Sequence, residues 1–301
     1  MPADLAELIS RHHTRPRTLS AVPRLRVVAL DTLVPPADVT NTPMVCLVAR
    51  GAKRTVVGAR SRVARAGEMY LNPVTMPVIA VFEEVPYRSA VLHLNARLLA
   101  DVAADAKPSR SACEPEALGS VPADPAVLDA MTRWARLLDT PEDIPALAEH
   151  REAELLYRLL ESPLGAQLCA CVLEDSATAR MREVARWITE HAADPLRIED
   201  IAREARLTPT TLHRQFRAVM GTSPRRFHKG VRLQDARRRI LAEGETATEA
   251  ATAVGYMSTS QFNREYRHAY GLPPLQDAVR IRRHLAGRDD AALEGELDTT
   301  G

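Results

Sequence analysis

Hydrophobic residues follow two different periods along this 301-residue chain, and the period changes near residue 125. After a short helical pattern over residues 4–13, the first third carries short, partly alternating apolar runs separated by Gly or Pro turns. This pattern is typical of strands in an antiparallel barrel or sandwich. The predicted strands cover residues 24–31, 44–50, 53–57, 61–65, 67–71, 76–82 and 87–94.

Beyond residue 125, apolar side chains recur at helical spacing. Val127, Met131 and Trp134 define one amphipathic helix, residues 144–160 predict a second, and residues 165–175 predict a short third. These helices either pack within their own chain or build a contact between two chains, and the pattern leaves both alternatives open. The Pro-, Ser- and Glu-containing segment that precedes them is interpreted as a linker.

Two C-terminal segments, residues 198–221 and 248–271, repeat one pattern. Each predicts a short Ala-containing helix, a tight turn and a second helix preceded by Thr or Ser, which is the arrangement of a helix-turn-helix. Leu212, Arg214, Phe216 and Gly221 recur fifty positions later as Phe262, Arg264, Tyr266 and Gly271.

Capping residues mark the second helix of each copy. Thr208 is the expected N-cap in the first copy, because Pro209 follows at the first helical position. In the second copy the cap is Ser258 or Thr259, and Gly255 suits a turn that needs a positive φ.

One long helix is predicted between the two copies, capped by Ser223, begun by Pro224 and ended by Gly244. It would hold the two helix-turn-helix units at a fixed separation. Its approximate apolar stripe consists of Phe227, Val231, Leu233 or Gln234, Ala236, Ile240 and Leu241.

Charge distinguishes this region from a helical bundle with an ordinary solvated face. Residues 206–239 hold ten basic residues and one acid, a net charge of +9 in a chain whose formal net charge is +1. Neutralisation of phosphates is the main sequence-independent term in DNA binding, so a basic block in a neutral chain favours a DNA partner.

A longer pattern runs through the same region: Gly221-x-Ser223-Pro224-x-x-Phe227, Arg232-Leu233-x-x-Ala236, Ala251-x-x-Val254-Gly255-Tyr256-x-Ser258-x-x-Phe262-x-Arg264-x-Tyr266 and Gly271-x-x-Pro274. It resembles the DNA-binding domain of the AraC family of bacterial transcription regulators, over about residues 180–284. Asp277-Ala278 stands where such proteins carry an aromatic–Arg pair, which predicts a different packing of the last helix.

The N-terminal strands are similar to the small cupin-like sensing domain of one AraC branch, at residues 47–53, 66–71 and 92–94. Metal-using cupins need a His-x-His and further ligands, whereas this region has His93 alone. We therefore expect no metal and no cofactor, and interpret His93 as a satisfied residue of the barrel wall.

The resemblance and the helix faces together assign DNA contacts. Arg reads guanine through two hydrogen bonds, Asn and Gln read adenine, and His donates to guanine or phosphate. The residues expected to read bases are Thr210, Thr211, His213, Arg214, Thr259, Ser260, Gln261, Asn263 and Arg264. The residues expected to bind phosphates are Arg217, Arg225, Arg226, Lys229 and Arg267. The alternative for Arg214 and Arg264 is contact with a phosphate only.

The resemblance implies a sequence-specific regulator that binds double-stranded DNA and a small-molecule effector at residues that stay unknown. RNA polymerase is a further candidate partner, and both a monomer and a homodimer remain open. An enzyme built on the barrel is the rival class, but it lacks metal ligands, a Gly-rich phosphate loop and a nucleophile motif, so we expect no enzyme. An architectural DNA binder without a ligand is a third alternative.

The cysteines are Cys46, Cys113, Cys169 and Cys171, too few for a secreted disulfide scaffold. Cys169 and Cys171 point in different directions on a helix and cannot easily chelate one metal. We interpret them as small buried residues, with a redox or electrophile sensor as the alternative. Since neither a signal peptide nor a membrane-length apolar run is visible, we expect a cytoplasmic protein with no membrane partner.

The predicted organisation is α+β. Residues 1–110 form a cupin-like antiparallel β-barrel that senses the effector, and residues 111–176 form a linker with a helical annex and a candidate dimer contact. Residues 177–286 form an all-α DNA-binding domain with two helix-turn-helix units joined by a long helix, and residues 287–301 form a disordered acidic tail.

Overall fold

The structure is a computed structural model that describes residues 1–12, 20–57, 60–105, 119–172 and 177–283. Seven strands within these residues form one antiparallel sheet with the order β1-β6-β3-β5-β7, while β2 pairs with β6 and β4 pairs with β3. The strands are β1 Leu25–Leu30, β2 Ala37–Asn41, β3 Met44–Val57, β4 Arg60–Arg65, β5 Glu68–Asn72, β6 Met76–His93 and β7 Val121–Pro122.

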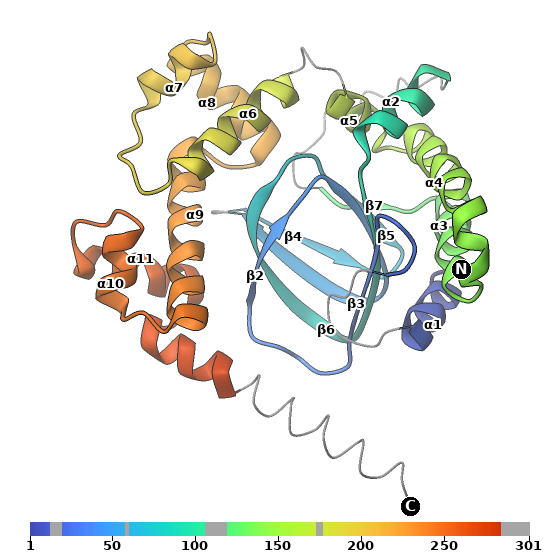
Figure 1. Ribbon diagram of the computed structural model, residues 1–301, viewed down its shortest axis with the longest axis horizontal. Coiled ribbons are helices and arrows are strands. Elements are labelled where there is room, and N and C mark those ends of the chain that lie inside the picture. The colour runs from blue at the N-terminus through green and yellow to red at the C-terminus, as the bar shows by residue number, and fades with distance from the viewer. Residues whose placement is uncertain (13–19, 58–59, 106–118, 173–176, 284–301) are drawn as a thin grey trace, which may run out of the picture.

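The long strands β3 and β6 bend (Figure 1). Each therefore pairs with one short strand before the bend and with another after it, β5 and β4 for β3, β2 and β1 for β6. Gly51 lies at the bend of β3 with a φ of +74°, where the register against β6 shifts. A Cβ at Gly51 would lie 2.4 Å from the carbonyl oxygen of Glu84 on β6, so the close approach requires glycine. Dividing residues 44–57 and 76–94 into four strands was therefore wrong, because a bulge bends a strand without ending its ladder.

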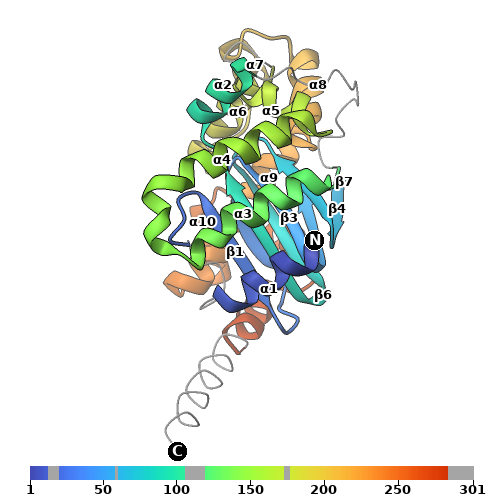
Figure 2. The same ribbon diagram turned by 90° about the vertical axis from the view of Figure 1, so that its right-hand side faces the viewer.

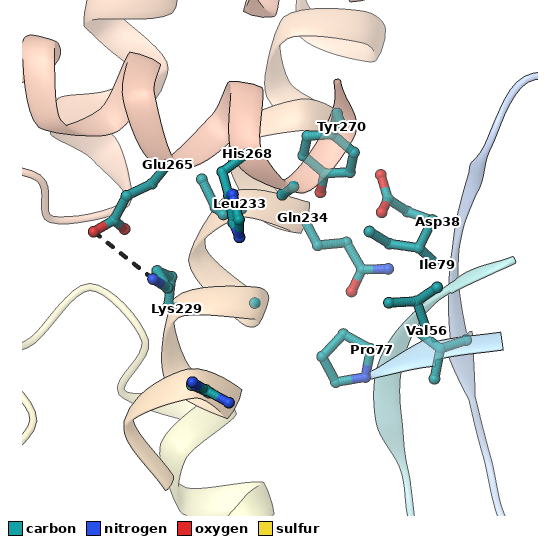
Figure 3. A pocket seen from close by; sticks show the side chains of 14 residues that line it. Asp38, Val56, Pro77, Ile79, Lys229, Leu233, Gln234, Glu265, His268 and Tyr270 are labelled. Carbon is teal, nitrogen blue, oxygen red and sulfur yellow. Dashed lines mark ion pairs between the residues drawn. The ribbon is translucent and has the colours of Figure 1, made fainter. Parts of the chain in front are cut away.

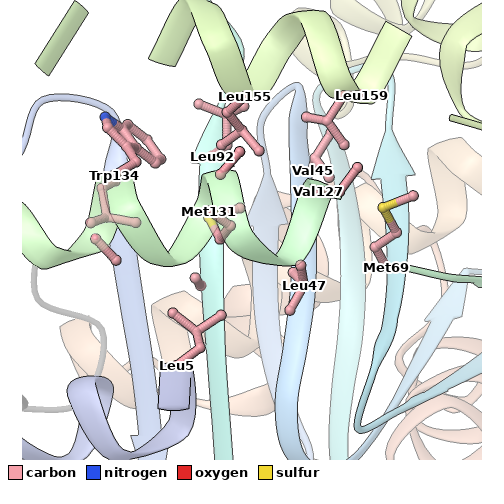
Figure 4. Packing of buried hydrophobic residues seen from close by; sticks show 14 of the residues in the cluster. Leu5, Val45, Leu47, Met69, Leu92, Val127, Met131, Trp134, Leu155 and Leu159 are labelled. Atoms are coloured by element: carbon pink, nitrogen blue, oxygen red, sulfur yellow. The ribbon is translucent and has the colours of Figure 1, made fainter. Parts of the chain in front are cut away.

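Helices cover one outer face of the sheet (Figure 2). Met131 and Leu155, from two of these helices, lie beside Leu92 of β6, and all three are fully buried (Figure 4). Arg24, just before β1, donates to Glu152 at 2.7 Å and ties the same layer to the sheet. The helices are α1 Pro2–His12, α2 Ala96–Asp105, α3 Pro125–Ala135, η1 Arg136–Leu138, η2 Pro141–Asp143, α4 Ile144–Glu161 and α5 Gly165–Val172.

This packing uses the apolar stripes of α3 and α4 inside the chain, which was one of the two alternatives for them. Each fully buried Leu or Met contributes about 1.5–3 kcal/mol to the free energy of folding, so the contact stabilises the fold substantially.

The elements β2 and α2 were not predicted from the sequence. The burial of β2 lacks a regular alternation, and its polar residues leave no clear period to detect.

The C-terminal helices lie on the other side of the barrel (Figure 1). They are α6 Ala177–Glu190, α7 Ile198–Glu204, α8 Pro209–Met220, α9 Pro224–Arg238, η3 Arg239–Glu243, α10 Ala247–Ala253 and α11 Thr259–Tyr270. A further helical segment covers residues 274–283. The predicted long helix is α9, whose last turn, η3, has π geometry and ends at Gly244 with a φ of +74°.

Two apolar cores hold these helices, one under each helix-turn-helix. The first contains Phe216 and also Val57, Met76 and Val78 from the strands, so it continues into the barrel. The second contains Phe262, and Ile79 packs against its edge.

The predicted α+β fold class is confirmed. The predicted linker falls largely on residues 106–118 and the predicted tail on 287–301, and both lie outside the described residues.

Candidate nucleic-acid interface

The first helix-turn-helix consists of α7 and α8. Leu212, Phe216 and Met220 bury one face of α8, as the spacing predicts. The hydroxyl of Thr208 accepts a hydrogen bond from the backbone N–H of Thr211 at 3.2 Å, which confirms Thr208 as the N-cap. The opposite face of α8, which carries Arg214 and Arg217, is exposed.

The second helix-turn-helix consists of α10 and α11. Ser258 is its N-cap, because its hydroxyl accepts from the N–H of Gln261 at 3.3 Å, so the choice between Ser258 and Thr259 is settled. Gly255 has a φ of +84°, and a Cβ there would lie 2.1 Å from the carbonyl oxygen of Ala193. The turn therefore fits tightly against the chain that follows α6.

The predicted base-reading residues lie on the surface at the start of α8 and α11. Thr210, Arg214, Ser260, Gln261, Asn263 and Arg264 are exposed, while Thr211, His213 and Thr259 are half-buried. The two sets occupy equivalent positions, because both helices begin at a hydroxyl cap and bury the same face. Their polar side chains share one face of each recognition helix.

The basic residues divide into two groups that the charge count did not separate. Arg214, Arg217, Arg225, Arg264 and Arg267 are exposed, and none of them forms an ion pair with another described residue. In contrast, the salt bridges and carbonyl contacts of the long linking helix involve Arg232, Arg237, Arg238 and Arg239. The charge available to a polyanion is therefore smaller than the sequence count of +9.

Arg232 has a structural contact. Its Nε donates to the carbonyl oxygen of Ala192 at 2.6 Å, and its Nη2 donates to those of Ala193 and Asp194 at 3.0 Å each. The ring of His228 lies 2.8 Å from the same Ala192 oxygen, and burial lowers the pKa of this histidine. These contacts hold α9 against the chain just beyond the C-terminal end of α6.

Arg237 is almost fully buried and joins three segments of the chain. Its Nε donates to Asp277 at 2.7 Å and its Nη1 donates to Asp38 of β2 at 2.7 Å. Tyr266 donates to the same Asp277 oxygen at 3.0 Å. Asp277 thus partners a buried arginine where the resemblance suggested an aromatic–Arg pair.

A cavity of about 230 Å³ lies between α9, α11 and the sheet (Figure 3). The sheet lines it with the apolar residues Val56, Pro77 and Ile79 and with Asp38. Lys229 and Glu265 lie 3.9 Å apart on its other side. Arg226 also lines it. Two of the predicted phosphate ligands therefore lie at the junction between the C-terminal helices and the barrel.

Among the described residues, no three His, Cys, Asp or Glu side chains come together where they could hold a metal ion. His93 was interpreted as a satisfied residue of the barrel wall, but its Nε2 is buried without a hydrogen-bond partner among the described residues. Its Nδ1 lies 2.8 Å from the hydroxyl of Thr42, and burial lowers the pKa of the ring. Among the described residues, no helix is both long and apolar enough to cross a membrane.

Two profiles of known families match the chain on either side of α6. The profile described as the AraC-type transcriptional regulator N-terminus matches residues 21–167, and that of a helix-turn-helix domain matches residues 201–278. The chain belongs to the AraC family of transcription regulators. The resemblance read from the two sequence patterns is confirmed.

Individual AraC relatives are distant. The activator RhaS of Klebsiella pneumoniae is 29% identical over 96 residues, covering 32% of this chain and 34% of RhaS. A probable thc operon regulatory protein of Rhodococcus erythropolis is 27% identical over 185 residues, covering 53% of this chain and 55% of that protein. The chain thus matches about a third to a half of the length of these curated relatives.

The fold is similar to that of apo ToxT from Vibrio cholerae, with a TM-score of 0.50 and 12% identity, covering 89% of this chain and all of the other. This likeness concerns the fold alone.

Asp38 and the buried position of Arg237 were not predicted from the sequence. The departure from the AraC pattern at Asp277 was the one local signal of that cluster.

Proposed function

We propose that this AraC-family chain is a sequence-specific DNA-binding transcription regulator that responds to a small-molecule effector in its N-terminal barrel. The observation that carries the proposal is the pair of equivalent recognition helices, each with an exposed polar face and arginines without acidic partners. An acid paired with each arginine would oppose DNA binding, and none is present among the described residues.

The proposed division of labour follows the two sides of the molecule. Residues 1–110 would sense the effector, residues 111–176 would support the barrel, and residues 177–286 would bind DNA. The apolar core between the barrel helices and the sheet has no residue in common with the two cores under the helix-turn-helix units, which supports this division. Coupling requires that the effector bind the DNA-competent and DNA-incompetent arrangements with different affinity.

For base reading we propose Arg214 and Arg264 as the central residues, because a guanidinium on the exposed face can contact guanine O6 and N7 together. The supporting readers would be Thr210, Thr211, His213, Thr259, Ser260, Gln261 and Asn263. Phosphates would be bound by Arg217, Arg225 and Arg267, with Arg226 and Lys229 contributing from the junction. RNA polymerase remains a proposed further partner, and the protein is proposed to act as a monomer or a homodimer.

The rival function, an enzyme built on the barrel, is not favoured by any group of residues described above, and the family consists of transcription regulators. We propose that the chain is not an enzyme and needs no metal or cofactor. As a DNA-binding regulator it would act in the cytoplasm.

Selection of bound sequences from random double-stranded DNA by the full chain tests the proposal. Two recognition helices on one linking helix should enrich sites with two conserved blocks about ten base pairs apart, one per major groove on the same DNA face. A pool that shows no enrichment after selection, with the protein folded, would contradict sequence-specific DNA binding.

A further inference from the structure

The inside of the barrel contains an arginine that has no acidic partner among the described residues. Arg62 of β4 is 5% exposed and lies opposite Thr55 of β3 in the ladder, so both side chains point to the same face. The centre of its guanidinium lies 3.7 Å from the centroid of the Tyr70 ring. Cation–π contact stabilises the charge but uses none of its N–H donors.

All three guanidinium nitrogens of Arg62 lack a hydrogen-bond partner among the described residues. The two other most buried arginines differ sharply from it. Arg88 donates to Asp31, Ser10 and two backbone carbonyls, and Arg237 donates to two carboxylates. A buried guanidinium usually has such partners, because a desolvated charge without them strongly destabilises the fold.

The surroundings of Arg62 offer hydroxyls rather than acids. The hydroxyls of Thr55 and Tyr87 are buried and also lack hydrogen-bond partners among the described residues. Lys53 adds a second cation, with its Nζ 3.2 Å from the hydroxyl of Tyr70. Burial lowers the pKa of Arg62, and the interactions that partly oppose this come from Tyr70, Cys46 and Tyr87, not from a carboxylate.

We propose that this interior is the effector site and that its ligand carries a carboxylate, which Arg62 binds through two N–H donors. A carboxylate accepts such paired hydrogen bonds in a geometry that matches a guanidinium. The proposal rests on the proposed function, since it names the chemical class of the effector that the regulator senses.

The rest of the ligand is apolar. The side chains that share the interior with Tyr70 are mainly aliphatic or aromatic, and they include Met44, Val48, Phe82 and Val91. An apolar lining with a few polar groups is the usual way in which proteins hold and orient a ligand with an apolar body. A small organic acid therefore fits, and a strongly hydrated anion such as phosphate does not.

Individual β-strands connect the site to the DNA-binding side of the protein. Thr55 faces the interior, and its neighbour Val56 lines the cavity against α9. On β2, Asp38 pairs with Ile79 of β6 and receives the hydrogen bond from Arg237 of α9. A ligand that moves β3 or β6 from inside thus acts directly on the contacts that hold α9.

The test measures thermal unfolding and calorimetric binding on the full chain with sodium hexanoate, hexan-1-ol and sodium phosphate. Hexanoate should raise the midpoint temperature of the wild type by about 2–5 °C at saturation, while the alcohol and phosphate should have little effect. Arg62→Met should weaken hexanoate binding by at least about tenfold, and Arg62→Lys should retain part of it. Arg65→Met, on the same strand but exposed, is the matched control and should bind hexanoate like the wild type.

Ligand-free stability gives a second readout. Arg62→Met removes an unpaired buried charge, so its midpoint without ligand should equal or exceed that of the wild type. Absence of hexanoate binding to the wild type, or equal binding to Arg62→Met, would overturn the proposal. A lower ligand-free midpoint in Arg62→Met but not in Arg65→Met would also overturn it, because the guanidinium would then have a partner within the protein.

DNA binding by the same wild-type sample separates the two proposals. If the sample selects specific DNA but ignores hexanoate, the carboxylate site is wrong and the regulator stands. If it binds hexanoate through Arg62 but selects no DNA, the proposed function is wrong.

Discussion

The Nη1 of Arg237 lies 2.7 Å from the Oδ2 of Asp38, joining the helix between the two helix-turn-helix units to an edge strand of the barrel. The two residues are 199 positions apart. Burial disfavours the charged guanidinium, but the carboxylates of Asp38 and Asp277 outweigh it and raise the pKa of Arg237. The pair therefore acts as a structural connection between the barrel and the C-terminal helices.

Replacing this arginine tests the connection. Arg237→Met should lower the free energy of unfolding by about 3–5 kcal/mol, because it removes the buried cation that pairs with the carboxylates of Asp38 and Asp277. Arg238→Met changes the next residue, which is largely exposed and paired on the surface, and should cost about 0–1 kcal/mol. Urea denaturation of both variants measures these free energies. Similar losses would mean that the buried cluster stabilises the protein no more than a surface ion pair does.

Base reading and phosphate binding should separate by mutation. Arg214→Ala should weaken the cognate site by about 1–3 kcal/mol and relax the preference at one or two base pairs. Arg225→Ala, at the start of α9, should weaken all sequences about equally. Site selection with each variant is the measurement. If Arg214→Ala keeps the wild-type preference, its contact is with a phosphate and base reading passes to Thr210, Thr211 and His213.

The salt dependence of DNA affinity should be set by the arginines that lack acidic partners, not by the total number of basic residues. Arg217 has no acidic partner among the described residues, so Arg217→Ala should reduce the slope of log affinity against log salt by about 1. Arg238 is bonded to Asp235 at 2.8 Å and Glu243 at 2.6 Å, so Arg238→Ala should change the slope much less. Titrations at several salt concentrations give both slopes, and equal reductions would contradict the division into two groups of arginines.

Two glycines with the same backbone conformation should respond differently to alanine. Gly244→Ala places a Cβ in open space and should cost about 1–2 kcal/mol for the left-handed conformation alone. Gly255→Ala should cost about 3 kcal/mol or more, since its Cβ would also collide with the carbonyl of Ala193. Thermal unfolding compares them, and a loss of DNA affinity is expected for Gly255→Ala only.

Thiol labelling tests the sensor alternative for the cysteines. Burial raises the pKa of Cys171 to about 12, and it also raises that of Cys169. At pH 8 roughly one Cys171 in ten thousand is a thiolate, so iodoacetamide should label it very slowly in the folded protein and rapidly in urea. Mass spectrometry of the labelled peptides measures the labelling rate of each cysteine. Fast labelling of the folded chain would favour an electrophile sensor.

The C-terminal elements could be predicted closely because their determinants are local. A cap, a buried stripe and a left-handed glycine lie within about twenty residues of one another in each helix-turn-helix, so each feature can be recognised from neighbouring residues. The strands were less predictable. Whether residues 44–57 form one strand or two depends on how closely Glu84 approaches Gly51, which no local period records.

The sequence by itself determined the two recognition helices, the face that each exposes and the family to which the chain belongs. Tertiary structure alone decided what each arginine does. Arg237 and Arg62 are the same residue type, yet the first binds two carboxylates and the second lies over the Tyr70 ring without a hydrogen-bond partner among the described residues. The energy of a buried charge depends on partners brought from distant parts of the chain, so it cannot be read from neighbours in sequence.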